Sequence, residues 1–119
     1  MNHSYNPNCL ITPYNLEIAV RDIQVGEELT CDYGTLNIVE PFDYPGASDG
    51  RKGVTPDDLT LYHSVWDKQI ESALAHFATV EQPLASLITP EIQKKLQAVM
   101  QGHQAPESIL SLYFEKVRA

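Results

Sequence analysis

Two short segments near the start of the chain combine residue types that can do chemistry. Residues 2–9 read Asn-His-Ser-Tyr-Asn-Pro-Asn-Cys, and residues 26–34 read Gly-Glu-Glu-Leu-Thr-Cys-Asp-Tyr-Gly. Histidine and cysteine bind metals, asparagine both donates and accepts hydrogen bonds, and a tyrosine hydroxyl can orient a reacting group. A metal site made of His3, Cys9 and Cys31 is the weakest interpretation, because the ligands are too few and their spacing fits no known site.

Together, in this order and spacing, the two segments resemble the C-terminal half of a SET domain. That fold belongs to S-adenosylmethionine-dependent protein-lysine methyltransferases. The resemblance covers residues 1–34 and extends into a second segment that ends at residue 53. It implies an α+β protein, in which the C-terminal part of a β-rich SET fold, with its pseudoknot, is followed by an α-helical tail. It also implies a protein-lysine N-methyltransferase, or an N-terminally truncated remnant of one.

The resemblance implies roles for four residues. Asn2 would hydrogen-bond the amino-acid end of S-adenosylmethionine, and the backbone of His3 would contact the adenine. Tyr33 would be the catalytic tyrosine and would also lie at the cofactor, with its hydroxyl where the lysine amine meets the methyl group. Methyl transfer is an in-line displacement, for which the protein chiefly supplies alignment. Phe42 would lie against the adenine, and a role as a core anchor is the equally weighted alternative.

Residues 42–53 resemble a degenerate post-SET segment. That segment has the form Phe-x-Cys-x-Cys-Gly, then a short gap and Cys-Arg, whereas Tyr44, Pro45 and Gly50 stand roughly where its cysteines would be. A tetrahedral zinc site needs thiolate or imidazole ligands. The sequence therefore predicts no metal here.

The resemblance does not include the N-terminal portion of the SET domain. In the family, that portion carries a Gly-x-Gly segment and the insert that binds the substrate peptide. Three explanations stay open: a degenerate paralogue, a misassigned start, or a fragment. The alternative to an enzyme is a catalytically inactive, SET-derived protein-interaction module whose helical tail docks a partner.

Residues 1–53 are expected to hold the half SET domain and the degenerate post-SET segment, built of strands and loops. Alternating apolar residues over 16–21 predict a half-buried strand, and residues 10–12 and 29–33 also suit strands. Prolines and glycines make residues 41–53 read as loop.

Residues 54–119 are expected to form a helical C-terminal extension that packs on the SET-like part. Thr55-Pro56-Asp57-Asp58 and Thr89-Pro90-Glu91 are helix-start signatures, because Thr can cap and proline suits the first turn. They predict helices over 56–78 and 90–101. A last helix is predicted from Pro106. The apolar stripes predict the packing faces: Leu59, Tyr62, Trp66, Ile70, Ala73, Leu74 and Phe77, then Ile92, Leu96, Val99 and Met100, then Ile109, Leu110, Leu112, Tyr113, Phe114 and Val117.

The bulk composition is that of one domain, or one domain with an appendage, in 119 residues with a net charge of −8. This acidity argues against nucleic acid as a direct partner and suits a lysine-containing protein or peptide substrate. The sequence has no apolar run of transmembrane length and no signal peptide, so we expect a cytoplasmic protein with reduced thiols and no membrane partner. Nothing in the sequence indicates the oligomeric state.

Overall fold

Short strands and two α-helices make up the computed structural model, which describes residues 1–114. The predicted α+β class is confirmed. The elements, in chain order, are β1 (Asn2–His3), β2 (Cys9–Ile11), β3 (Glu17–Ala19), β4 (Thr30–Cys31), the 3-10 helix η1 (Tyr33–Thr35), β5 (Phe42–Asp43), β6 (Gly53–Val54), α1 (Asp58–Ala75), η2 (Ala85–Leu87), α2 (Pro90–Met100) and η3 (Ile109–Leu112).

The strands of the first half join the two segments that the sequence singled out. β1 pairs with β4 in parallel, with Asn2 opposite Thr30 and His3 opposite Cys31. The β2–β3 hairpin lies between them in the chain and pairs antiparallel. The side chain of Asn8 reinforces this arrangement, because its amide donates to the carbonyl of Glu28 at 2.8 Å and its oxygen accepts the N–H of Thr30 at 2.9 Å. This buried amide therefore ties residues 2–9 to residues 26–34.

The loop predicted over residues 41–53 is wrong at both of its ends. Phe42 pairs with Val54 and Asp43 with Gly53, so the segment is a hairpin with a long connection. The pairing needs a glycine at 53, because a Cβ there would lie 2.2 Å from the carbonyl oxygen of Phe42. The partners are ten or more residues apart, so no local pattern in the sequence could reveal the pairing.

Both predicted long helices are present, with small shifts at their ends. α1 begins at Asp58 rather than at Pro56, because the Thr55 hydroxyl accepts the N–H of Asp57 at 3.3 Å and donates to the carboxylate of Asp58 at 2.8 Å. α2 begins as predicted: the hydroxyl of Thr89 accepts the N–H of Ile92 at 3.4 Å.

The helix predicted from Pro106 is wrong for the described residues, and its predicted member Val117 lies outside them. Only the short 3-10 helix η3 forms, capped by Ser108. The residues just before η3 are held in an extended conformation by hydrogen bonds to distant side chains. The N–H of Glu107 donates to the hydroxyl of Tyr14 at 2.9 Å, and the N–H of Ile109 donates to the carboxylate of Asp67 at 2.7 Å.

One hydrophobic core joins the two halves of the chain. Leu10 and Tyr14 come from the SET-like half, and the other members come from the helices and η3: Leu59, Trp66, Ile70, Leu74, Ile92, Leu96 and Ile109. The helices therefore pack on the SET-like part through shared buried side chains. The domain boundary at residue 53 stays a prediction.

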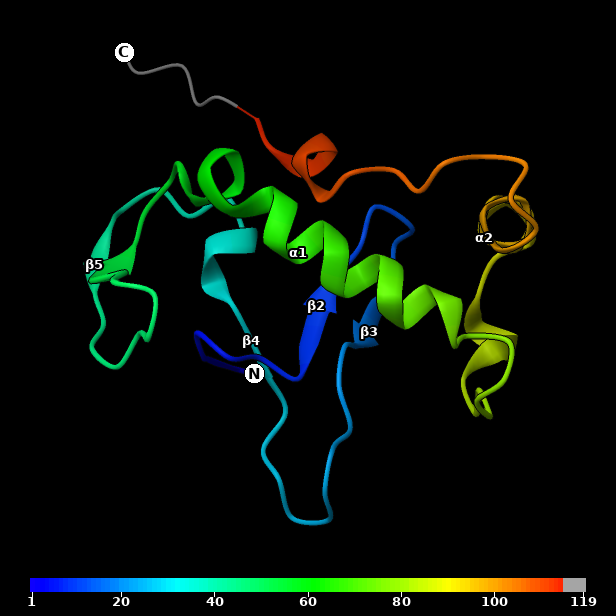
Figure 1. Ribbon diagram of the computed structural model, residues 1–119, viewed down its shortest axis with the longest axis horizontal. Helices are drawn as coiled ribbons and strands as arrows, with labels where there is room; N and C mark the ends of the chain where they lie inside the picture. Colours follow the sequence, from blue (N-terminus) through cyan, green and yellow to red (C-terminus); the bar gives the residue numbers. More distant parts are fainter. Residues whose placement is uncertain (115–119) are drawn as a thin grey trace.

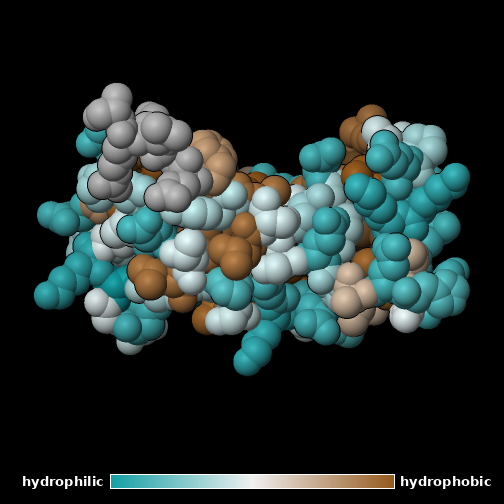
Figure 2. Space-filling model, turned by 90° about the horizontal axis from the view of Figure 1, so that it is seen from above, coloured by the Kyte–Doolittle hydropathy of each residue, from teal (hydrophilic) through white to brown (hydrophobic). Residues whose placement is uncertain are grey.

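α1 runs across the middle of the molecule, with the β5–β6 hairpin near its first turn and α2 beyond its last (Figure 1). The strand β3 lies beside its central turns. Seen from above, the surface is mostly polar, with hydrophobic side chains in small separate patches (Figure 2). None of the helices within residues 1–114 is both long and apolar enough to cross a bilayer.

The shared core generates a stability prediction. Leu10→Ala should lower the free energy of unfolding by about 2–5 kcal/mol, because it leaves a cavity against α1. Circular dichroism of the helices and fluorescence of Trp66 should then unfold at the same lowered urea midpoint. Leu29→Ala is the matched control, since Leu29 is 49% exposed in the same half. A helical transition that Leu10→Ala leaves unmoved would contradict the shared core.

Candidate functional site

His3 lies at the centre of the residues that the sequence predicted as a site. It is buried on β1, and its Nδ1 accepts the backbone N–H of Tyr33 at 3.0 Å. This bond joins the first matched segment directly to the second. Because Nδ1 accepts, the neutral ring carries its proton on Nε2, which is buried with no hydrogen-bond partner among residues 1–114.

The surroundings of His3 disfavour its charged form. Burial lowers the pKa of His3 below its ordinary value of 6.5, and the nearby guanidinium of Arg51 lowers it further. The carboxylates of Asp32 and Asp58 oppose this effect without cancelling it. Protonation of Nδ1 would also set a donor against the N–H of Tyr33. His3 is therefore a neutral hydrogen-bond acceptor in the folded protein.

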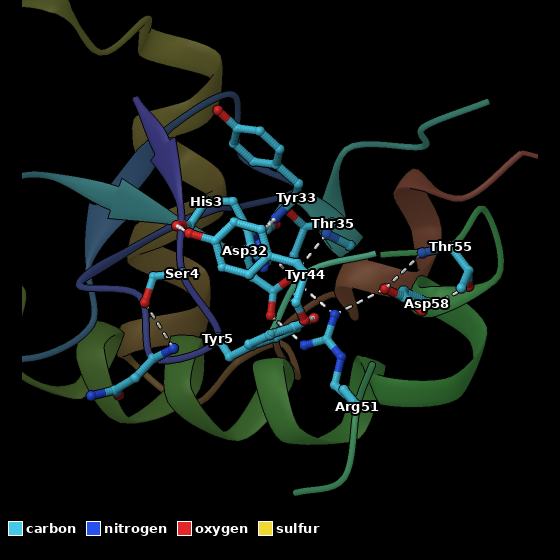
Figure 3. A network of polar contacts seen from close by, with 12 residues as sticks. His3, Ser4, Tyr5, Asp32, Tyr33, Thr35, Tyr44, Arg51, Thr55 and Asp58 are labelled. Atoms are coloured by element: carbon cyan, nitrogen blue, oxygen red, sulfur yellow. Dashed lines mark hydrogen bonds and ion pairs between the residues drawn. The ribbon is translucent and has the colours of Figure 1, made fainter. Parts of the chain in front are cut away.

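Tyr33 is the first residue of η1 and does not belong to the strand predicted over 29–33. The strand ends at Cys31 because the carboxylate of Asp32 accepts the N–H of Gly34 at 2.9 Å and starts the 3-10 turn. The ring of Tyr33 is half-buried and points away from the buried polar residues (Figure 3). Its hydroxyl donates to the carbonyl of Met1 at 2.5 Å and keeps its own lone pairs as acceptors.

The other two predicted residues have different places. Phe42 on β5 has its ring 6.3 Å from that of His3 and 6.4 Å from that of Tyr33, so these three lie together. It is 38% exposed, which does not fit the core-anchor alternative. Asn2 is exposed, and its amide donates to the carboxylate of Glu28 at 3.2 Å. Neighbouring side chains on a strand point to opposite sides, which separates Asn2 from the ring of His3.

Two further tyrosines belong to the same cluster, although no pattern in the sequence places them there. The rings of Tyr5 and Tyr44 are T-shaped to His3, with centroids 4.7 and 4.6 Å away. The hydroxyl of Tyr5 donates to the backbone carbonyl of Tyr44 at 2.6 Å. The hydroxyl of Tyr44 donates to the backbone carbonyl of His3 at 3.4 Å. These bonds fasten the connection between β5 and β6 to the first segment.

A buried ionic network lies under this aromatic cluster (Figure 3). The guanidinium of Arg51 donates to both carboxylate oxygens of Asp32, at 2.5 and 3.1 Å, and to Asp58 at 2.9 Å. The three side chains are 5%, 1% and 2% exposed, respectively. Burial by itself lowers the pKa of Arg51, but the two carboxylates outweigh it and raise that pKa. Sequence reasoning missed the network, because nothing local tells an arginine which distant acids it meets.

Two hollows flank the aromatic cluster. The smaller, of about 210 Å³, is lined mainly by residues 3–6 and 44–46. The larger, of about 450 Å³, lies between the β5–β6 hairpin and the start of α1, where Phe42, Arg51 and Tyr62 line it. Neither Asn2 nor Tyr33 lines either hollow. The predicted site residues thus surround a cluster and do not enclose one cavity.

The described part of the chain offers no support for the metal interpretation. Within residues 1–114, no group of three or more His, Cys, Asp or Glu side chains is placed to hold an ion. Burial raises the pKa of the Cys9 and Cys31 thiols, which keeps both protonated and makes them poor ligands.

Comparison with known families agrees with this geometry. Residues 1–34 match the family model described as SET domain. This match supports a SET-domain family protein. Searches of curated proteins and of solved structures returned no match. The match contains Asn2, His3 and Tyr33, whereas Phe42 and Arg51 lie outside it. The post-SET resemblance of residues 42–53 therefore stays a prediction.

The neutral His3 generates a pH prediction. A histidine whose pKa is lowered on folding stabilises the folded state above its ordinary pKa of 6.5, and that contribution is lost as the pH falls below 6.5. In His3→Gln, which keeps an acceptor for the Tyr33 N–H, the loss of stability between pH 7.5 and 5.5 should be smaller than in the wild type. The difference should be at most about 1.4 kcal/mol per pH unit.

Urea unfolding at the two pH values measures this effect. His103→Gln is the control, because His103 is exposed and should leave the pH dependence unchanged. An equal loss in His3→Gln and the wild type would show that His3 is not held neutral by folding.

Proposed function

We propose that this SET-domain protein carries the cofactor-facing and lysine-facing part of an S-adenosylmethionine-dependent protein-lysine N-methyltransferase. The observation that carries the proposal is the bond between the Tyr33 N–H and Nδ1 of His3, at 3.0 Å. It brings the two matched segments into one unit and fixes the backbone from which the Tyr33 ring extends. The family match supports the fold, and the chemistry is our inference from these residues.

The residues present fit part of a cofactor site. A hollow of about 210 Å³ beside His3 and Tyr44 is smaller than the 300–1,000 Å³ of a typical small-molecule site. It would therefore hold one end of S-adenosylmethionine against the backbone of His3, while Phe42 lines the larger hollow on the other side of the aromatic cluster. The side-chain oxygen of the exposed Asn2 would accept from the ammonium of the amino-acid end, while its amide nitrogen donates to Glu28. When bound, the cofactor supplies a methyl group on a sulfonium.

Tyr33 can align the acceptor amine. Its hydroxyl donates to the carbonyl of Met1, so its lone pairs remain to accept an N–H from a substrate lysine or a weak C–H contact from a polarised methyl. The neighbouring rings of His3 and Phe42 lie 5.4 and 6.4 Å away and make one wall of the site apolar. An apolar wall disfavours the ammonium and favours the neutral amine that attacks. The substrate would be a lysine-containing protein or peptide, which the net charge of −8 would attract.

A second candidate function is a catalytically inactive, SET-derived interaction module. The observation that favours it is the separation of the site residues: Asn2 is bonded to Glu28, and Tyr33 lines neither hollow. The two candidates make opposite predictions for cofactor binding.

Calorimetric titration of S-adenosylmethionine into the chain separates them. The enzyme proposal expects binding with Kd in the range of about 1 µM to 1 mM that is usual for enzyme substrates, and weaker binding by Asn2→Ala. Gln97→Ala, an exposed amide on α2, is the control and should bind as the wild type does. No binding by a chain that circular dichroism shows to be folded would contradict the proposal and favour the interaction module.

A second prediction concerns Tyr33 itself. Tyr33→Phe should lower methyl transfer from labelled S-adenosylmethionine to lysine peptides by roughly 10²–10³-fold, the cost of losing one positioned hydrogen-bonding group. Its thermal midpoint should stay within about 2 °C of the wild type, because the hydroxyl serves no buried partner in the core. Tyr113→Phe makes the same change away from the site and should keep full activity. Wild-type turnover by Tyr33→Phe would remove Tyr33 from the proposed role.

A further inference from the structure

The guanidinium of Arg51 joins three parts of the chain that are separate in sequence. Asp32 belongs to the segment that matches the SET family, Arg51 precedes β6, and Asp58 is the first residue of α1. Both Nη atoms donate: Nη1 to Asp32, and Nη2 to both Asp32 and Asp58. This planar two-pronged arrangement is specific to arginine, because an ammonium cannot reproduce its fork.

Aromatic rings surround the guanidinium, and the three side chains of the network are at most 5% exposed. The guanidinium carbon lies 4.7 Å from the ring centroids of both Tyr5 and Tyr62, and 5.9 Å from that of Trp66. Two carboxylates and one guanidinium in such surroundings interact far more strongly than a surface pair, and their geometry is correspondingly rigid. Arg51 therefore restricts the motion of the segments that are bonded to Asp32 and Asp58.

One of those partners holds the turn that carries Tyr33. The Oδ1 atom of Asp32 that accepts from Arg51 also accepts the N–H of Gly34, at 2.9 Å. From the other side, Gly34 packs so closely on α1 that a Cβ would lie 2.8 Å from the side chain of Asp58. The turn is thus enclosed between two carboxylates that the same guanidinium binds.

Arg51 also holds the hairpin that carries Phe42. It precedes Lys52, whose carbonyl accepts the N–H of Tyr44 at 3.0 Å next to the β5–β6 pairs. Displacing Arg51 would therefore release the hairpin from the turn. Phe42 and Tyr33, whose rings are 6.4 Å apart, keep their relative position only while this link holds.

We propose that Arg51 is a positioning residue: its guanidinium fixes the turn at residues 32–35 and with it the direction of Tyr33, and it holds the Phe42 hairpin against that turn. Its effect on methyl transfer rests on the proposed function, whereas its effect on the turn does not. The two are therefore measured separately.

Amide hydrogen exchange, followed by NMR under native conditions, tests the effect on the turn. In Arg51→Lys, exchange of the Tyr33 and Gly34 amides should accelerate roughly 10- to 100-fold, the equivalent of one charge-assisted hydrogen bond. The amides of Ile92 and Leu96 on α2 should keep their wild-type rates. Arg21→Lys is the matched control, because Arg21 pairs with Glu27 at 2.7 Å but is 37% exposed; it should leave the Tyr33 and Gly34 amides unchanged.

Each other result overturns the proposal. Equal acceleration of exchange in the turn and in α2 would show that Arg51 contributes only to global stability. Unchanged exchange rates of the Tyr33 and Gly34 amides would show that the turn does not depend on Arg51. A failure of Arg51→Lys to fold would show that the whole core depends on the fork. Arg51→Met, which keeps an unbranched apolar stem but is shorter and loses the charge, should accelerate the same two amides more than Arg51→Lys does.

Methyl transfer tests the effect on the site. If the chain is active, Arg51→Lys should lower kcat at least tenfold while the KM for S-adenosylmethionine changes less than threefold, because Arg51 does not line the hollow proposed for the cofactor. An unchanged kcat in a variant with a loosened turn would overturn the positioning role. Inactivity of the wild type would contradict the proposed function and leave the exchange result to decide the rest.

Discussion

A buried cation needs partners on every side, and this requirement organises the half of the molecule that carries the candidate site. The guanidinium of Arg51 meets two carboxylates and three aromatic rings, all contributed by other segments. Taking such a group out of water is costly unless its partners are in place together. The hairpin, the turn at Tyr33 and the first turn of α1 must therefore assemble as one unit.

The same network explains why His3 can be a neutral acceptor. Asp32 lies 3.8 Å from its Nδ1 and would favour an imidazolium, but Arg51 already takes most of that carboxylate's hydrogen-bonding capacity. Burial then decides the balance against the charge. A neutral ring can accept the N–H of Tyr33, so the ionic network beneath the aromatic cluster and the bond that joins the two SET segments depend on each other.

The helices supply the surface on which this unit is built. α1 contributes Asp58 to the network with its first turn and buries Trp66, Ile70 and Leu74 farther along. Leu10 and Tyr14 of the SET-like half share that core. In a chain of 119 residues a single core has little excess stability. The tail therefore supports the site through the rigidity of α1, and its described residues, 54–114, contribute no side chain to the aromatic cluster around His3.

The sequence by itself determined the two long helices and indicated the family. Thr89 and Pro90 begin a helix through contacts within one turn, and an apolar stripe at a 3.6-residue period needs only its own neighbours to be recognised. The residue types at 2–9 and 26–34 were likewise enough to indicate a SET domain, and the family match to residues 1–34 agrees. Tertiary structure alone decided the rest. Whether Tyr33 ends a strand or opens a turn depends on Asp32, and where Asp32 points depends on Arg51, 19 residues away. The β5–β6 pairing, the tyrosines around His3 and the loss of the last helix depend in the same way on distant partners. Such partners are chosen by burial and charge balance in three dimensions, which no local pattern in a single sequence records.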